Sequence, residues 1–329
     1  MKKIVIPKAG DKGVFQIVEE NQPLPGPGEV LIDVHYSGIN FADILMRQGL
    51  YQDAPPFPFV PGYEVSGKAR ELGEGVTDLK VGEPVMAGCL FGGYSGQVVV
   101  PANHVKRLPD DRDETMQMGA SVLVSFLTAY LCLFETLKIR SGESLMIDCS
   151  TGALGQMMMQ LLEGMDVQVS GMTSSPEKVD FLKKMGVTPI IGGYENVTKG
   201  VKYDCIVNSR GGQSVQTANQ YLKTLGRQVL VGASDMVKPK KSSLVKVIGT
   251  WWKMRSLDTI AMINQNVGFF GLNVLNIFKE GDLVERYLNQ FDHFNIKSTV
   301  DKVFPYQDVG EAHEYIEQRK SKGKVLLKW

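Results

Sequence analysis

A strand, a turn of small residues and a helix follow one another at residues 145–162, and this unit constrains the fold most. Residues 145–147 have the apolar character of a buried strand, and Gly152 and Gly155 lie in the turn. Such a turn lets backbone N–H groups approach the pyrophosphate of a dinucleotide, and the helix N-terminus adds partial positive charge. Ser150 replaces the first glycine of the G-x-G-x-x-G pattern, so a plain strand–helix connection is the alternative.

The chain beyond residue 122 alternates short apolar strands with helices. Strands are expected at 145–149, 167–171, 203–208, 227–233 and 269–275, and helices at 156–162, 175–186 and 213–224. Ser175 is expected to cap its helix, with Pro176 at the first helical position. Alternation of this kind predicts a parallel sheet covered by helices.

The two ends of the chain have a different character. The first 120 residues are rich in glycine and proline, with strands expected at 29–36, 65–69, 83–87 and 94–100. Frequent turns between short strands favour a small barrel-like domain. The C-terminal residues are expected to add helices around 283–291 and 309–319 and strands around 299–303 and 324–327.

Composition excludes several classes of protein. The 329 residues include 36 Lys and Arg and 36 Asp and Glu, so we expect no nucleic-acid partner. Four scattered cysteines and a short apolar run at the N-terminus favour a reducing, cytoplasmic location without a signal peptide. Residues 115–134 carry no charge, but polar residues dilute them, which favours a buried helix pair over a transmembrane segment.

Several short motifs carry a family resemblance. They are SGINFAD at 37–43 with Arg47, Gly49 and Tyr51, PGYEVSG at 61–67, LTAY at 127–130 and GES at 142–144. On these residues the chain resembles the medium-chain dehydrogenase/reductase superfamily and, within it, the zinc-independent quinone oxidoreductases of the zeta-crystallin-like family. TWW at 250–252 and GKVLL at 323–327 resemble the branch of the synaptic-vesicle (vesicle amine transport) membrane protein.

The resemblance implies a two-domain α/β architecture. A Rossmann doubly wound parallel sheet, residues 123–276, would be inserted in a GroES-like β-rich catalytic domain made of residues 1–122 and 277–329. It also implies a homodimer joined by edge strands of the Rossmann sheets, here residues 269–275.

Three positions bear on metal binding. Zinc members of the superfamily have cysteine where this chain has Asn40 and histidine where it has Tyr63, and their third ligand position falls at Val124. Thiolate and imidazole hold a catalytic zinc, whereas an amide, a phenol and an isopropyl group do not. We therefore expect no metal, and reduction of a quinone or an activated double bond instead of alcohol oxidation.

The segment 171–175, GMTSS, bears on the choice of cofactor. An NAD site usually has an acidic residue there, about 20 residues after the glycine turn, to bind the ribose 2′-OH. The segment has no acid, and Lys178 follows where the family has a lysine. Ser174 and Lys178 therefore favour the 2′-phosphate of NADPH, although Ser174 and Ser175 could also simply cap the helix.

Other predicted cofactor contacts come from the glycine turn and from strand ends. These are Gly152, Ala153, Leu154, Gly155, Asn208, Ser209 and Gly232. The resemblance implies that Thr128 reaches the nicotinamide ribose and that Phe270 and Leu272 border the nicotinamide ring. It also implies that Lys324 contacts phosphate and that Tyr194 packs beside the adenine ribose.

Asn40, Asp43 and Tyr51 are the candidate catalytic residues. Asn40 can hydrogen-bond a carbonyl or a cofactor hydroxyl, and Tyr51 can donate a proton without carrying charge. The alternatives are a buried structural role for Asp43, paired with Arg47 or the backbone, and a place at the pocket rim for Tyr51. The apolar side of the substrate pocket is expected to include Phe41 and Tyr63 with Phe57 and Phe59.

The favoured function is a zinc-independent, NADPH-dependent reductase that transfers hydride to a quinone or an α,β-unsaturated carbonyl. One alternative is an enoyl-thioester reductase of the same fold. Another is a weakly active, NADPH-binding regulatory or membrane-peripheral protein. In that case Trp251, Trp252 and Phe269 would form a surface for a partner or a lipid, the alternative being burial in the core or at a dimer interface.

Overall fold

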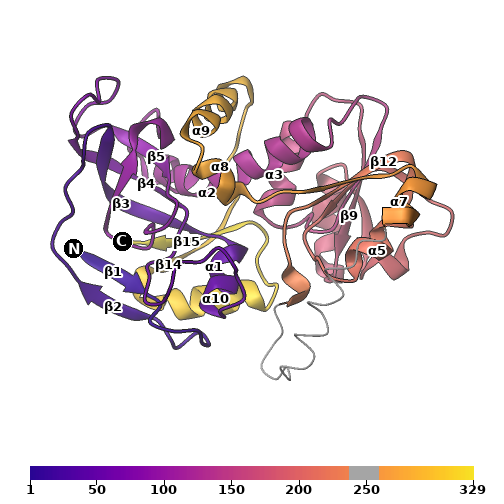
Figure 1. The fold of residues 1–329 in the computed structure, drawn as a ribbon, viewed down its shortest axis with the longest axis horizontal. Coiled ribbons are helices and arrows are strands. Elements are labelled where there is room, and N and C mark those ends of the chain that lie inside the picture. The colour runs from indigo at the N-terminus through magenta and orange to yellow at the C-terminus, as the bar shows by residue number, and fades with distance from the viewer. Residues whose placement is uncertain (237–258) are drawn as a thin grey trace. The chain divides into compact units, whose positions relative to one another are not determined.

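The structure is a computed structural model that describes residues 1–236 and 259–329 (Figure 1). It contains two compact units: Met1–Leu127 together with Val274–Trp329 forms unit 1, and Thr128–Asn273 forms unit 2. The predictions for Thr250, Trp251 and Trp252 lie outside the described residues.

Unit 1 is built on a seven-stranded sheet to which both ends of the chain contribute. Its order is β14-β15-β3-β4-β5-β7, and β6 also pairs with β3. The strands are β3 (Glu29–Ile39), β4 (Glu64–Leu72), β5 (Pro84–Gly88), β6 (Gln97–Pro101), β7 (Val105–Arg107), β14 (Val300–Pro305) and β15 (Lys324–Lys328). The late strand β15 pairs antiparallel with β3, with Leu327 opposite Ser37. A separate hairpin pairs β1 (Lys2–Val5) with β2 (Gln16–Glu19).

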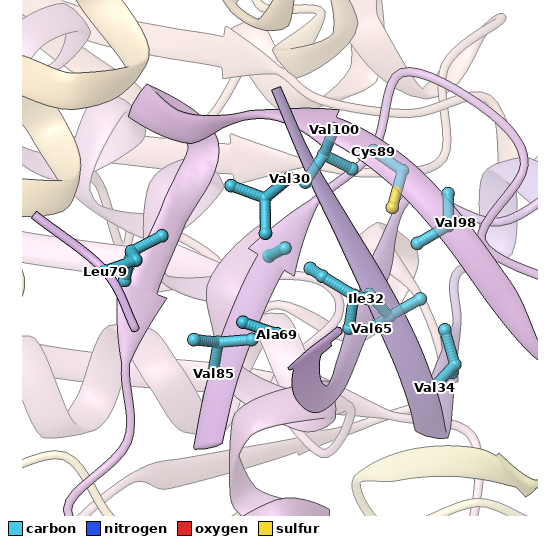
Figure 2. Packing of buried hydrophobic residues seen from close by; sticks show 11 residues of the cluster. Val30, Ile32, Val34, Val65, Ala69, Leu79, Val85, Cys89, Val98 and Val100 are labelled. Carbon is cyan, nitrogen blue, oxygen red and sulfur yellow. The ribbon is translucent and has the colours of Figure 1, made fainter. Parts of the chain in front are cut away.

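One face of β3 carries the core of this sheet. Val30, Ile32 and Val34 alternate along the strand, so their side chains point to the same side. They pack against apolar residues of neighbouring strands, which include Val65, Ala69, Val85, Val98 and Val100 (Figure 2). Full burial of such a side chain contributes about 1.5–3 kcal/mol. This packing fixes the strand whose end leads into Asn40.

Five helices accompany the sheet among the described residues of unit 1. They are α1 (Phe41–Arg47), most of α2 (Asp113–Tyr130), α8 (Val274–Phe278), α9 (Gly281–Leu288) and α10 (Val309–Glu317). A π-helical turn, Leu131–Thr136, continues α2, so one continuous helix replaces the helix pair predicted for residues 115–134. Within residues 1–236 and 259–329, only this helix is long and apolar enough to cross a membrane. Its apolar window is 72% buried, as in a core helix.

Unit 2 contains a six-stranded sheet whose strands all run parallel, which confirms the predicted doubly wound sheet. The order is β10-β9-β8-β11-β12-β13. The strands are β8 (Ser144–Ile147), β9 (Gln168–Thr173), β10 (Thr188–Ile191), β11 (Tyr203–Asn208), β12 (Leu222–Leu230) and β13 (Gly268–Gly271). The described helices are α3 (Ala153–Leu161), α4 (Val179–Lys184), α5 (Ser214–Asn219) and α7 (Thr259–Gln265). The chain reverses direction across the sheet between β8 and β11, where open α/β sheets bind their ligands.

Two predicted elements of unit 2 are wrong in extent. The strand predicted at 269–275 ends at Gly271, because its neighbour β12 ends at the paired Leu230, and Val274–Phe278 forms α8. The helix predicted at 213–224 ends at Asn219, because Leu222 already pairs with Tyr203 in the sheet. The first error concerns a short apolar run, which does not by itself distinguish a strand from a buried helix.

Candidate functional site

The glycine turn connects β8 to the N-terminus of α3. Gly152 is the N-cap residue, and α3 begins at Ala153. A Cβ atom on Gly155 would lie 2.5 Å from Ser150 Cα, so only glycine lets α3 pack this closely on the turn. A Cβ atom on Gly152 would meet nothing nearer than 3.7 Å. The first N–H groups of α3 have no partner within the helix, so this turn fits a dinucleotide phosphate.

Ser150 ties this turn to the neighbouring strand. Its hydroxyl donates a hydrogen bond to the Met172 carbonyl oxygen at 2.7 Å. Gly171 faces the same side chain, since a Cβ atom there would lie 2.6 Å from Ser150 Cβ. The serine in place of the first motif glycine therefore has a structural role: it fixes the turn beside the carboxyl end of β9.

The carboxyl end of β9 carries the residues predicted to select the cofactor. The strand ends at Thr173, and no carboxylate lies in residues 171–175. Ser175 is the N-cap residue of a 3₁₀ turn, Pro176–Lys178, and α4 begins only at Val179, so the helix predicted at 175–186 is shorter than expected. The Ser175 hydroxyl donates to Glu177 and does not cap the helix. The Lys178 side chain is largely buried beside this strand end.

A polar cluster around Asp148 was not predicted from the sequence. Asp148 follows β8 directly, and its carboxylate accepts hydrogen bonds from the Ser209 N–H at 2.9 Å and hydroxyl at 2.7 Å. The Tyr194 hydroxyl donates to the same carboxylate at 3.3 Å. Burial raises the pKa of Asp148 to about 6, against the effect of the Ser209 hydrogen bonds. An acidic residue directly after an apolar strand was the one sequence signal for this cluster.

Tyr194 and Asn208 are held by protein groups in this structure. Tyr194 is 2% exposed, and its ring stacks on Tyr221 with centroids 6.3 Å apart. The Asn208 side chain accepts from the Arg210 and Gly211 N–H groups, each at 3.0 Å, and donates to the Gln228 side chain at 2.9 Å. Asn208 therefore shapes the turn after β11, and its predicted contact with the cofactor stays a prediction.

The other predicted cofactor residues of unit 2 differ in exposure. Phe270, on the edge strand β13, is 50% exposed. Thr128 and Leu272 are partly exposed. Gly232 follows β12, and a Cβ atom there would lie 2.7 Å from the Ser209 carbonyl oxygen, so glycine allows these two strand ends to approach. Their roles toward a cofactor remain predictions.

In unit 1, Asn40 lies between a buried carboxylate and a buried ammonium group. Its Nδ2 donates to Glu64 Oε1 at 3.0 Å, and its Oδ1 accepts from Lys324 Nζ at 2.7 Å. Lys324 also forms an ion pair with Glu64, and both side chains are almost completely buried. Glu64 Oε2 accepts the Val124 N–H at 2.9 Å. Residues of β4 and β15 thus hold both the oxygen and one N–H of the Asn40 amide.

Asp43 holds the backbone on either side of Asn40. Its carboxylate accepts the Asn40 N–H at 2.8 Å and the Gly62 N–H at 3.1 Å, and its side chain is fully buried. Arg47 pairs with Glu317 at 2.5 Å. Of the two structural partners considered for Asp43, the backbone is the one the structure shows.

Tyr63, Tyr51 and Phe41 lie in the same unit. Tyr63 is 2% exposed, its hydroxyl donates to Met46 Sδ at 3.1 Å, and its ring centroid lies 5.7 Å from that of Phe91. Burial raises the pKa of Tyr63, and the nearby Asp43 and Tyr51 raise it further. Phe41 and Tyr51 are partly exposed, so they are more accessible than Tyr63.

The fall in stability between pH 5 and pH 7 is expected to be smaller in an Asp43→Asn variant than in the parent protein. Burial raises the pKa of Asp43 to about 7 from an ordinary value of 3.8, so the folded state binds this proton more tightly than the unfolded state. Its contribution to stability is fully present below pH 3.8 and falls as the pH rises toward 7, by about 2 kcal/mol between pH 5 and pH 7. Urea unfolding of both proteins at the two pH values measures the difference.

Asp148 is present in both proteins, so its contribution to the pH dependence of stability cancels in this comparison. Equal pH slopes for the two proteins would contradict the raised pKa of Asp43.

The three positions at which the resemblance places zinc ligands do not offer zinc donors here. Asn40 has an amide already bonded to Lys324, Tyr63 has a buried phenol, and Val124 has no donor atom. Zinc is held by thiolate, imidazole and carboxylate groups. Among the described residues, no group of three or more His, Cys, Asp or Glu side chains could hold a metal ion. These residues do not fit a catalytic zinc.

Two protein families match the chain. Residues 26–110 match the alcohol dehydrogenase GroES-like domain, and residues 145–327 match the family described as zinc-binding dehydrogenase. The synaptic vesicle membrane protein VAT-1 homolog of Rattus norvegicus is 32% identical over 329 aligned residues, which cover 96% of this chain and 81% of that protein.

Solved structures share the complete fold. The human synaptic vesicle membrane protein VAT-1 homolog-like protein superimposes with a TM-score of 0.83 at 25% identity, covering 100% of this chain and 98% of that one. The quinone oxidoreductase of Thermus thermophilus, solved also in complex with NADPH, has a TM-score of 0.80 at 27% identity, with full coverage of both chains. The chain therefore belongs to the medium-chain dehydrogenase/reductase superfamily, within its zeta-crystallin-like quinone oxidoreductase family and close to the VAT-1 branch.

Proposed function

We propose that this oxidoreductase is a zinc-independent, NADPH-dependent reductase of quinones or α,β-unsaturated carbonyl compounds. The observation that carries the proposal is the glycine turn at the point where the strand order reverses. There Gly155 lets α3 pack against Ser150, and residues 171–175 at the neighbouring strand end include no acidic residue. The Thermus thermophilus quinone oxidoreductase in complex with NADPH supports the choice of cofactor.

Asn40 is proposed to orient the reacting end of the substrate or cofactor. NADPH, when bound, supplies the hydride. Lys324 and Glu64 hold the oxygen and one N–H of the Asn40 amide, so the amide plane is fixed. Among the described residues the second Nδ2 hydrogen has no partner. We assign it to a substrate carbonyl or a cofactor hydroxyl. Asp43, which binds the Asn40 N–H, acts as a positioning residue.

Tyr51 is proposed to donate the proton. A phenol donates at neutral pH without carrying charge, and Tyr51 is partly exposed whereas Tyr63 is buried. Phe41 and Tyr63 are assigned to the apolar side of the pocket. An acceptor that is flat and hydrophobic suits these side chains.

We further propose a cytoplasmic homodimer joined through β13. This strand lies at the edge of the parallel sheet and pairs only with β12 among the described strands. Its Phe270 is half exposed. An unpaired strand edge with an exposed aromatic residue is a surface that a second copy can extend.

The proposed function is tested by NADPH consumption with four acceptors. These are 1,4-benzoquinone, 9,10-phenanthrenequinone, an alkenal and a crotonyl thioester. Turnover of a quinone or the alkenal is expected. Turnover of the thioester alone would identify an enoyl-thioester reductase. Tight NADPH binding with no turnover would favour the alternative of a regulatory or membrane-peripheral protein. The similarity to a synaptic vesicle membrane protein is the reason to test for it.

A pair of tyrosine variants sharpens this test. Tyr51→Phe is expected to lower kcat for the alkenal by about 100-fold, the usual contribution of a general acid, while NADPH binding is unchanged. Tyr36→Phe is the matched control. It removes a tyrosine hydroxyl of the same unit that donates to Asp113 and has no role in the proposed site, and we expect a small effect on kcat. Equal losses in the two variants would contradict the role of Tyr51.

A further inference from the structure

We infer that Arg210 provides a second cationic contact for the 2′-phosphate of the cofactor, beside Lys178, and so sets the preference for the phosphorylated nucleotide. The inference rests on the proposed function, because it requires NADPH to bind at the glycine turn. Arg210 follows β11 by two residues, and β11 is separated from β9 by β8. From the sequence alone it has no evident relation to the end of β9.

The guanidinium group of Arg210 nevertheless reaches the end of β9. A Cβ atom built on Gly193 would lie 2.9 Å from Arg210 Nη1 and 2.6 Å from Glu195 Oε2, so a cation and a carboxylate both approach this glycine. The adjoining Gly192 donates its N–H to the carbonyl oxygen of Thr173, the last residue of β9, at 2.8 Å. The cation therefore lies beside the strand end to which the sequence assigns the 2′-phosphate.

The orientation of the guanidinium group leaves its two terminal nitrogens, Nη1 and Nη2, available to a ligand. Nε alone bonds Asp235, at 3.1 Å and 3.2 Å to the two carboxylate oxygens. Among residues 1–236 and 259–329, Nη1 and Nη2 of Arg210 make no hydrogen bond or ion pair. The Tyr194 ring lies under the group, 5.9 Å from Arg210 Cζ. Asp235 holds one edge of the planar guanidinium group and the Tyr194 ring lies against one face, so the group is preorganised to bind a phosphate.

Acidic side chains near the Arg210 guanidinium group oppose the binding of a phosphate. Asp235 competes with a phosphate for the guanidinium charge, the Glu195 carboxylate approaches Gly193 as Nη1 does, and Asp148 accepts a hydrogen bond from the Tyr194 hydroxyl. A phosphate dianion gains from Arg210 and loses from Asp235. Removing the arginine should therefore weaken binding of the phosphorylated nucleotide, and removing the charge of Asp235 should strengthen it.

Calorimetric titration with nucleotide fragments tests this assignment. The probes are 2′,5′-ADP, which carries the 2′-phosphate, and 5′-ADP, which lacks it, followed by NADPH and NADH. Arg210→Gln is expected to weaken 2′,5′-ADP and NADPH by about tenfold or more, the worth of a charge-assisted hydrogen bond. Binding of 5′-ADP and NADH should be unchanged. Asp235→Asn should shift the same ratio in the opposite direction.

A matched arginine provides the control. Arg227 is also partly buried and ion-paired, with Glu143, which precedes β8 and so lies at the opposite end of the sheet from the glycine turn. Arg227→Gln should leave the ratio of the two affinities unchanged. Thermal unfolding of each variant reports any general loss of structure.

The outcomes separate this inference from the proposed function. Parent protein that binds neither NADPH nor NADH overturns both. Parent protein that prefers NADPH, together with an Arg210→Gln variant that keeps the same preference, overturns only the role of Arg210. Equal weakening of 2′,5′-ADP and 5′-ADP in that variant would assign Arg210 to the fold or to the diphosphate, and would also overturn the inference.

Discussion

Replacing Gly155 with alanine is expected to lower the free energy of unfolding by about 3 kcal/mol and to abolish NADPH binding. The added Cβ would lie 2.5 Å from both Cα and the carbonyl oxygen of Ser150, and these backbone atoms cannot rotate away. The helix α3 must therefore shift outward, taking its N-terminal N–H groups with it. Urea unfolding and NADPH titration of the purified variant measure the two effects.

Gly152→Ala is the matched control for this experiment. A Cβ atom there has 3.7 Å of clearance, and the residue has φ −82°, which alanine adopts without strain. We expect a change in stability below about 1 kcal/mol. NADPH binding should still weaken, because the methyl group stands where the phosphate approaches the backbone. Equal destabilisation by the two substitutions would contradict the packing described for Gly155.

Replacing Lys324 with methionine is expected to destabilise the protein by about 3–5 kcal/mol. The substitution keeps the apolar length of the side chain but leaves the Glu64 carboxylate buried without its counter-charge. It also frees Asn40 Oδ1, so activity should fall together with stability. Chemical denaturation at neutral pH measures the loss.

A double variant distinguishes charge burial from lost packing. Glu64→Gln combined with Lys324→Met removes both charges and keeps amide groups that can still bond Asn40 and the Val124 N–H. It should be more stable than Lys324→Met alone. A double variant no more stable than Lys324→Met would contradict burial of the unpaired Glu64 charge as the cause.

The parallel sheet could be predicted from the sequence because its signals are local. Apolar strands, the glycine turn and Pro176 at the start of a 3₁₀ turn each lie within a few residues of the chain. The extent of the strand at 268–271 could not be predicted, because it depends on where its partner β12 ends. Sequence patterns give the type of an element more reliably than its boundaries.

The same difference between local signals and long-range contacts applies to the candidate sites. Asn40 and the glycines were recognised from motifs, but the partners of Asn40 come from β4 and β15, far away in the sequence. The contact between Arg210 and Gly193 also depends on strand order. The role of Asp43 could not be predicted from the sequence, because only the structure shows that both its carboxylate oxygens accept hydrogen bonds from backbone N–H groups.

The pairing of β15 with β3 has a consequence for biosynthesis. All strands of the parallel sheet are translated before residues 324–328, so unit 2 can fold while the sheet of unit 1 still lacks the neighbour of β3. Until that strand arrives, Glu64 also has no ammonium partner. The nascent chain therefore carries an open sheet edge until residues 324–328 have left the ribosome, and this interval is when a chaperone would be needed most.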